Sequence, residues 1–208
     1  MKHIPPRVDE ALAWKLVPRQ GRPLRMPWRG ERAPASSRLP RLELIWLPYY
    51  LFDFRGTSIN GEKTLTVSVQ GHCAAFAFFE MHELLAEGEP PGPFFPPRMT
   101  EFEALESGRL NLVSTLLRVR RIRGRFTPQE VIAQGVVQYP YWICYFLRRG
   151  GLIDFKTLDA VTGEPAASKL KDAIIWAFCR EHDGRTAAGS RAGPEGLRRP
   201  VDPRAAGP

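Results

Sequence analysis

One segment of this sequence occurs twice in related form, 92 residues apart. The two copies are Leu44–Phe54 (LIWLPYYLFDF) and Val136–Phe146 (VVQYPYWICYF), and each contains a proline followed by an aromatic pair. The same offset pairs smaller residues further along, namely Val69 with Val161, Gly71 with Gly163, and Ala74–Ala75 with Ala166–Ala167. Internal repetition restricts the fold strongly, because each copy tends to form one structural unit that packs against its neighbour. We therefore expect a core made of two related units.

The first unit, residues 42–88, has the pattern of a β-hairpin followed by a helix. An apolar and aromatic run over 42–54 precedes Asn60–Gly61, which is a strong signal for a tight hairpin turn. Thr64–Val69 then alternates polar and apolar residues, as a half-buried strand does. From 74 to 86 the apolar residues recur at helical spacing, which predicts a helix.

The second unit, residues 127–182, repeats this order after an additional helix. Thr127, Pro128 and Glu130 stand where a helix N-terminus favours them, which predicts a helix to Gln134. The elements expected next are an aromatic strand, a turn, a return strand and a helix, over Val136–Leu147, Arg149–Gly151, Ile153–Val161 and Ala166–Arg180. The turn lies nearer the proline than in the first unit, so the two hairpins must differ in register.

These patterns predict an α+β fold in which two related ββα units form a mostly antiparallel sheet with helices largely on one face. Proline cannot donate a backbone hydrogen bond to a ladder, so Pro48 and Pro140 indicate a bend or an edge in each aromatic strand. We expect the two aromatic strands to lie side by side or to be related by an approximate twofold axis.

Three segments flank or separate the two units. Residues 1–41 are expected to form a short helix and an arm rich in Arg and Pro. Residues 89–126 contain a proline-rich linker, a capping pair that predicts a short helix over Thr100–Glu106, and a basic stretch, Leu110–Ile122, expected to be a strand. Residues 183–208 have few large apolar side chains, which predicts a disordered tail.

The region Thr127–Glu164 resembles a PepSY-type module. It has the expected order of a short helix, a hairpin and a return strand, and it ends in Leu158–Glu164 (LDAVTGE), similar to the turn that closes such modules. The resemblance implies a small α+β sheet and carries no implication for chemistry here.

Charge and hydropathy limit the cellular setting. The net charge of +8 and the isoelectric point near 9.8 favour contact with nucleic acid or an anionic surface without specifying either. Met1–Pro18 lacks the apolar stretch of a secretion signal, and no apolar run approaches the roughly 20 residues that a membrane helix needs. The three cysteines are widely spaced, as expected of free thiols in a reducing compartment. We therefore expect a cytoplasmic protein without a membrane span.

The motifs of common catalytic and cofactor sites are missing. His82–Glu83 begins like the zinc-protease helix motif, but Ala86 stands where the second histidine is needed. The sequence contains no nucleophile elbow and no glycine-rich nucleotide loop of the usual types. We expect no catalytic residue, no cofactor and no metal site.

Two groups of residues are candidate contact surfaces. The first is a basic group that could contact phosphates, or could be a solvated strand end; it comprises Arg118, Arg120, Arg121, Arg123, Arg125, Arg148 and Arg149. The second is an aromatic group around the two prolines that could line a groove between the units, or could be core; it comprises Trp46, Tyr49, Tyr50, Tyr139, Tyr141 and Trp142.

The leading functional prediction is a small, non-enzymatic binding or regulatory protein that engages another macromolecule, either a protein or nucleic acid. The alternative is an enzyme or a small-ligand-binding protein that uses the aromatic groove. The sequence does not specify the oligomeric state.

Overall fold

The computed structural model describes residues 1–17, 39–58, 60–123, 126–147, 153–167 and 169–178. The longest elements are two strands and one helix, namely β2 (Arg41–Ser58), β6 (Thr127–Leu147) and α2 (Glu101–Arg123). The shorter elements are β1 (Lys2–His3), α1 (Glu10–Leu16), β3 (Gly61–Gln70), β4 (Phe76–Phe78), the 3-10 helix η2 (His82–Leu84), β5 (Ala86–Glu87), β7 (Ile153–Asp159) and a helix over 169–178. The fold is α+β, and its sheet is mostly antiparallel.

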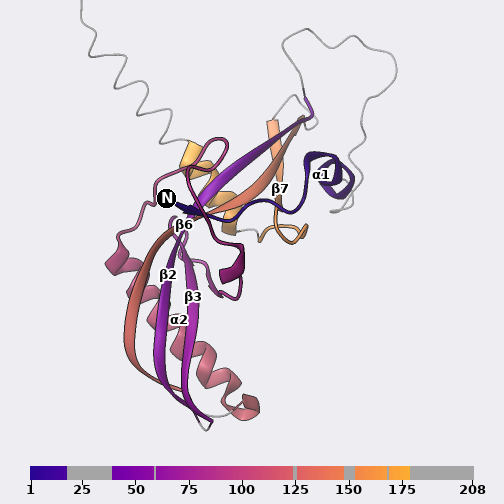
Figure 1. The fold of residues 1–208 in the computed structure, drawn as a ribbon. Coiled ribbons are helices and arrows are strands. Elements are labelled where there is room, and N and C mark those ends of the chain that lie inside the picture. Colours follow the sequence, from indigo (N-terminus) through magenta and orange to yellow (C-terminus); the bar gives the residue numbers. More distant parts are fainter. Residues whose placement is uncertain (18–38, 59, 124–125, 148–152, 168, 179–208) are drawn as a thin grey trace, which may run out of the picture.

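The sheet is built around the pairing of β2 with β6, which run side by side and antiparallel for almost their full length (Figure 1). Leu47 lies opposite Tyr139, its counterpart at the 92-residue offset, with Trp46 opposite Pro140 and Pro48 opposite Gln138. A local approximate twofold axis therefore passes between Leu47 and Tyr139. The prediction that the two aromatic strands lie side by side is confirmed.

Each long strand also forms a hairpin with the strand that follows it. In the first hairpin Ser58 lies opposite Gly61, as the Asn60–Gly61 signal predicts. In the second, β7 pairs with β6 and Tyr141 lies opposite Asp159. The turn expected at Arg149–Gly151 lies outside the described residues.

The turns that follow the two return strands share one backbone pattern. The N–H of Gln70 donates to the carbonyl of Ala75, and the N–H of Asp159 donates to the carbonyl of Glu164. Four positions after Gln70 and after Asp159, the backbone is in the left-handed region, with φ of 53° at Ala74 and 76° at Gly163. Gln70 and Asp159 are 89 residues apart, whereas the aromatic segments are 92 residues apart. The two hairpins therefore differ in register by three residues. The sequence match of Gly71 with Gly163 is therefore not a structural equivalence.

The helix expected over 74–86 does not form. Ala74 has a left-handed backbone, and Phe76–Phe78 instead pairs with β3, which satisfies backbone groups that a helix would have used. Aromatic residues in this run also favour a strand. Only the second unit ends in a helix, over 169–178, so the two units are not both ββα. The prediction of two related ββα units is therefore not confirmed.

The segment Leu110–Ile122 is helical, which corrects the expected strand. The start of α2 is as predicted, since the N–H of Thr100 donates to Oε2 of Glu103 at 2.7 Å and the N–H of Glu103 donates to Oγ1 of Thr100 at 3.3 Å. Ala104 and Leu112 are eight residues apart, a spacing that places both on one side of a helix, and both are buried facing β2 and β3. This packing stabilises the helix beyond Glu106.

The helix expected over Thr127–Gln134 is also wrong, because β6 already begins at Thr127. Pro128 lies opposite Gly56, where a Cβ on Gly56 would stand 2.1 Å from the carbonyl oxygen of Thr127. The glycine thus permits a close approach of the two strands at the β-bulge between Arg55 and Gly56. Pairing with β2 overrides the local helix signal.

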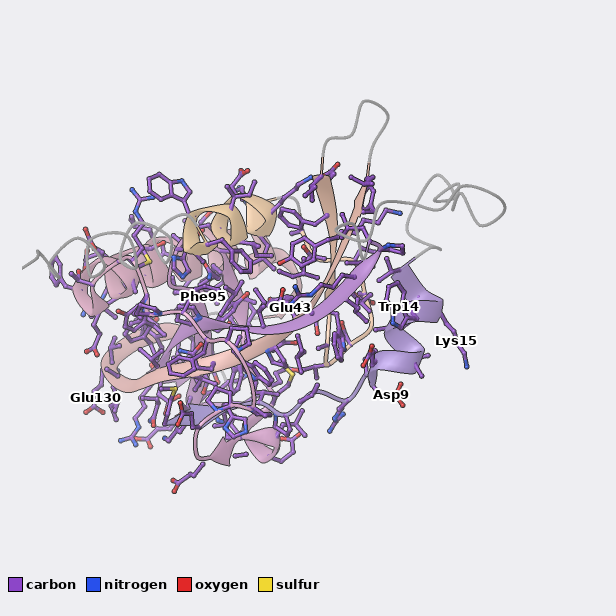
Figure 2. The ribbon with its side chains drawn as sticks, turned by 90° about the horizontal axis from the view of Figure 1, so that it is seen from above. Asp9, Trp14, Lys15, Glu43, Phe95 and Glu130 are labelled. Atoms are coloured by element: carbon purple, nitrogen blue, oxygen red, sulfur yellow. The ribbon has the colours of Figure 1, made fainter. Side chains whose placement is uncertain are left out.

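Helices cover both faces of the sheet, not largely one face as the sequence suggested. Even-numbered residues of β2 pack against α1 near Leu44 and against α2 near Phe52. Odd-numbered residues such as Leu47 pack against the helix over 169–178. Trp14 of α1 and Glu130 of β6 mark opposite ends of the molecule, with Phe95 between them (Figure 2).

The proline-rich linker is more than a spacer, because part of it extends the sheet. The N–H of Trp46 donates to the carbonyl of Pro93 at 3.0 Å, and the N–H of Phe95 donates to the carbonyl of Trp46 at 3.3 Å. Phe95 is 3% exposed and its ring meets that of Phe178. The linker thus occupies the edge of β2 beyond the end of β3.

Candidate functional site

Three tyrosines meet at the approximate twofold axis between β2 and β6. Tyr49, Tyr139 and Tyr141, here called the tyrosine cluster, project from the same face of the sheet because β2 and β6 pair in a register that matches odd-numbered residues. The ring centroids of Tyr49 and Tyr139 are 5.5 Å apart, and those of Tyr139 and Tyr141 are 5.2 Å apart. The Oη atoms of Tyr49 and Tyr141, which are 92 residues apart in the chain, lie 2.6 Å apart.

Asp159 provides the negative charge of the site. It stands at the end of β7, opposite Tyr141. Its carboxylate accepts a hydrogen bond from Oη of Tyr139, which lies 3.0 Å from Oδ1 and 2.9 Å from Oδ2. The backbone N–H groups of Val161 and Thr162 donate to Oδ1 at 2.8 and 2.9 Å. The strand end and its turn therefore hold the carboxylate in place and leave it facing the tyrosines.

The phenols of the cluster stay protonated at neutral pH. Burial raises the pKa of Tyr139, and the negative charge of Asp159 raises it further. Burial likewise raises the pKa of Tyr49 and of Tyr141. All three side chains therefore act as neutral hydrogen-bond donors or acceptors and not as phenolates.

One phenol proton of the cluster is not used. Tyr139 donates to Asp159, and the contact between Tyr49 and Tyr141 is a single hydrogen bond that uses one of their two protons. In the part of the chain that the structure describes, neither of these two hydroxyls has another hydrogen-bond partner. The second proton is available to a group in the space beside the cluster.

Two cavities adjoin the cluster and share Tyr49, Tyr141 and Asp159 as a common wall. The first has a volume of about 160 Å³, and its remaining lining is mostly apolar: Ile4, Leu51, Ser68, Ala77, Phe78, Phe79, Met81, Val137 and Tyr139. The second, of about 260 Å³, lies against the turn after β7 and the start of the last helix; its remaining lining is Ala75, Thr162, Glu164, Pro165, Ala166, Ala167, Lys169 and Leu170. Both can admit only a small molecule.

The other three aromatic candidates lie on the opposite face and belong to the core. Tyr50 donates from Oη to the carbonyl of Met99 at 2.8 Å, beneath α2. Trp142 donates from Nε1 to the carbonyl of Val8 at 2.7 Å, beneath α1, and Trp46 is fully buried. The six aromatic residues of the predicted groove thus lie on two opposite faces of the sheet, three on each. Of the two sets, only the tyrosine cluster adjoins the two cavities.

Four of the seven arginines of the basic group belong to a helix and not to a strand. Arg118 is exposed near the C-terminal end of α2. Three more arginines, Arg120, Arg121 and Arg123, also belong to α2, but their side chains lie outside the described part of the structure. Arg125, Arg148 and Arg149 are outside the described residues altogether. Cations at this end complement the partial negative charge of the helix C-terminus.

Sequence reasoning missed Asp159 and the residues from Phe78 to Met81 as parts of the site. In the sequence, Asp159 stands out only as part of the turn Leu158–Glu164. The pattern that could have revealed its role is the match of Asp159 with Gln70, since each side chain accepts hydrogen bonds from the two N–H groups that follow in its turn.

Other chemistry is limited in the described residues. They contain no group of three or more His, Cys, Asp or Glu side chains that could hold a metal ion. Cys73 and Cys144 are free thiols, and burial raises the pKa of both, which lowers their reactivity at neutral pH. Among the described helices, none is long and apolar enough to cross a membrane.

Comparison of the chain with protein-family models, with curated proteins and with solved structures gives no match.

Proposed function

We propose that this protein is a non-enzymatic binding protein that holds a small ligand against the tyrosine cluster. The observation that carries the proposal is the unused phenol proton of the Tyr49–Tyr141 pair, on the wall that both cavities share. Each hydroxyl of the pair has the other as a partner, and the proton that their hydrogen bond leaves over can be donated to a ligand with a hydrogen-bond acceptor.

The lining indicates the chemistry of this ligand. Apolar and aromatic side chains such as Leu51, Phe79 and Val137 favour a hydrocarbon body. In the first cavity Asp159 is the only charged lining residue among those described, and its carboxylate disfavours an anion, so the acceptor there belongs to an uncharged group such as a carbonyl or an ether. Each cavity is smaller than the 300–1,000 Å³ or so of sites for drug-sized ligands, which favours a compact molecule.

The protonation state of the cluster supports binding over catalysis. A general base works best with a pKa near the operating pH, whereas burial raises the pKa of Tyr49, Tyr139 and Tyr141 above the ordinary phenol value. Phenols held neutral are suited to orient a ligand by hydrogen bonding.

Two probes that share a six-membered ring and differ in charge test the proposal. Cyclohexanone offers a neutral acceptor, and cyclohexanecarboxylate offers an anionic one. We expect cyclohexanone to raise the melting temperature in a concentration-dependent manner and the carboxylate to have little effect. Failure of cyclohexanone to stabilise the protein, or equal stabilisation by the carboxylate, would contradict the proposed chemistry.

A pair of matched variants locates the binding. Tyr49→Phe combined with Tyr141→Phe removes both hydroxyls of the pair and therefore its unused proton, whereas Tyr50→Phe removes a hydroxyl on the opposite face of the sheet. Stabilisation by cyclohexanone should decrease for the double variant and stay at the wild-type level for Tyr50→Phe. Equal decreases in both variants would place the effect outside the tyrosine cluster.

The exposure of Arg118 on α2 favours a second candidate function, the binding of nucleic acid. Five arginines within Arg118–Arg125 could neutralise several phosphates, and affinity would then decrease steeply with salt, by a log–log slope of roughly −0.7 per contact for single strands. The triple substitution Arg120→Ala, Arg121→Ala and Arg123→Ala should flatten this slope. Binding that is absent at low salt would eliminate this function.

A further inference from the structure

The outer face of α2 exposes a row of large apolar side chains. Phe102, Leu110, Val113 and Leu117 are 73%, 72%, 48% and 59% exposed. Their spacing is close to whole helical turns, so they lie along one side of the helix. This row, here called the outer stripe, is separate from the inner positions Ala104 and Leu112, which are buried against the sheet. The helix is therefore apolar on two sides.

A row of this kind is unusual on a surface that contacts only water. Single exposed apolar residues are ordinary, but a contiguous group of large ones marks an interaction site. Glu106 is the polar residue in the middle of the row, and Arg109 donates to its carboxylate at 3.1 Å. That ion pair reduces the charge that would have to be desolvated if the stripe were covered.

Charge is distributed asymmetrically along α2. The first two turns carry Glu101, Glu103 and Glu106, and the last two turns carry Arg118, Arg120, Arg121 and Arg123. A second α2 in antiparallel orientation would bring the acidic end of each helix to the basic end of the other. A parallel partner would bring like charges together.

We propose that the outer stripe binds the outer stripe of a second copy of this chain, with the two α2 helices antiparallel. Leu110 lies near the centre of the stripe, so it meets Leu110 of the second copy, and Phe102 meets Leu117. The contact is isologous, as expected for a twofold homodimer. An anionic membrane is the less suitable occupant, because the acidic N-terminal half of α2 would be repelled from it.

Sedimentation velocity over a range of concentrations tests the association. Wild-type protein should change from monomer to dimer as concentration increases. Leu110→Glu should raise the dissociation constant by at least about tenfold, because it places a charge in the centre of an apolar contact. Leu12→Glu, the same change at a 42% exposed leucine on α1, should leave the dissociation constant unchanged. Circular dichroism checks that both variants are folded.

Cysteine cross-linking tests the orientation. Antiparallel helices bring Phe102 near Leu117 of the second copy, so Phe102→Cys mixed with Leu117→Cys should cross-link more than either variant alone or wild type. Parallel helices would instead cross-link each variant with itself, which would overturn the proposed orientation. The proposal is also overturned if wild type stays monomeric throughout, or if it binds vesicles of phosphatidylcholine and phosphatidylglycerol as a monomer.

Discussion

Replacement of Trp142 by alanine should lower the free energy of unfolding by about 3–5 kcal/mol. The side chain is 8% exposed and packs beneath α1 against Val8 and Leu158. A buried tryptophan removes about 200 Å² of surface from water, which is worth about 5 kcal/mol at about 25 cal/mol/Å², and alanine retains about 1 kcal/mol of this. The loss of about 4 kcal/mol agrees with measured costs of such truncations.

The hydrogen bond of Trp142 contributes a separate amount. Its Nε1 donates to the carbonyl of Val8 at 2.7 Å, so Trp142→Phe keeps most of the apolar contact and loses the donor. We expect Trp142→Phe to cost about 1–3 kcal/mol, because a buried carbonyl is left without its partner. The difference between the two variants separates packing from hydrogen bonding.

Urea unfolding at constant pH measures both effects, with the midpoint shifting and the slope staying constant. Trp176→Ala is the matched control, since Trp176 is 50% exposed and its ring lies 4.4 Å from the guanidinium of Arg98. Its loss should cost about 0.5–1 kcal/mol. If Trp142→Ala unfolds within 1 kcal/mol of Trp176→Ala, the assignment of Trp142 to the core is refuted.

Three more predictions concern the sheet and its tyrosines. Gly56→Ala should disrupt the β2–β6 pairing and lower the melting temperature strongly, whereas Gly61→Ala, with φ of 101° and open space around it, should cost only about 1 kcal/mol. Tyr139→Phe should cost about 1–2 kcal/mol in chemical denaturation, because the carboxylate of Asp159 loses its phenol donor. Stability should decrease above about pH 10, because the unfolded chain releases phenol protons that the cluster retains, at up to about 1.4 kcal/mol per pH unit for each tyrosine. A melting temperature constant from pH 9 to pH 11 would contradict the raised pKa values.

The sequence predicted best those elements that local chemistry determines. The Asn60–Gly61 turn, the Thr100–Glu103 capping pair and the N-terminal helix all depend on residues close together in the chain. The pairing of β2 with β6 is non-local, and it was predictable only because the repeat marks both strands with the same proline and aromatic pair.

The errors occurred where a distant partner overrides a local signal. Thr127–Pro128 is a good helix start, yet β2 offers backbone groups that β6 satisfies from Thr127 onward. The residues after Ala74 have helical spacing, yet β3 pairs with them as β4. Neither partner can be inferred from the segments themselves.

The candidate site was predictable in part. Tyr49, Tyr139 and Tyr141 were identified from their position beside the prolines, but three other aromatics were grouped with them. Odd and even positions point to opposite faces, so the register of β2 and β6 decides which tyrosines meet, and β2 and β6 are joined by no tight turn that would fix this register locally. Part of the lining of the cavities comes from the segments after β4 and β7, whose placement depends on the finished sheet.

The antiparallel pairing of β2 with β6 also determines the order in which parts of the chain can fold. Trp46 and Pro140 are neighbours in the sheet although they are 94 residues apart in the chain, so this contact closes a long loop and is expected to form slowly. During synthesis β2 can pair with β3 well before β6 exists. Until β6 arrives, one edge of an aromatic strand stays open to pairing with other chains, which makes this interval the one most prone to aggregation.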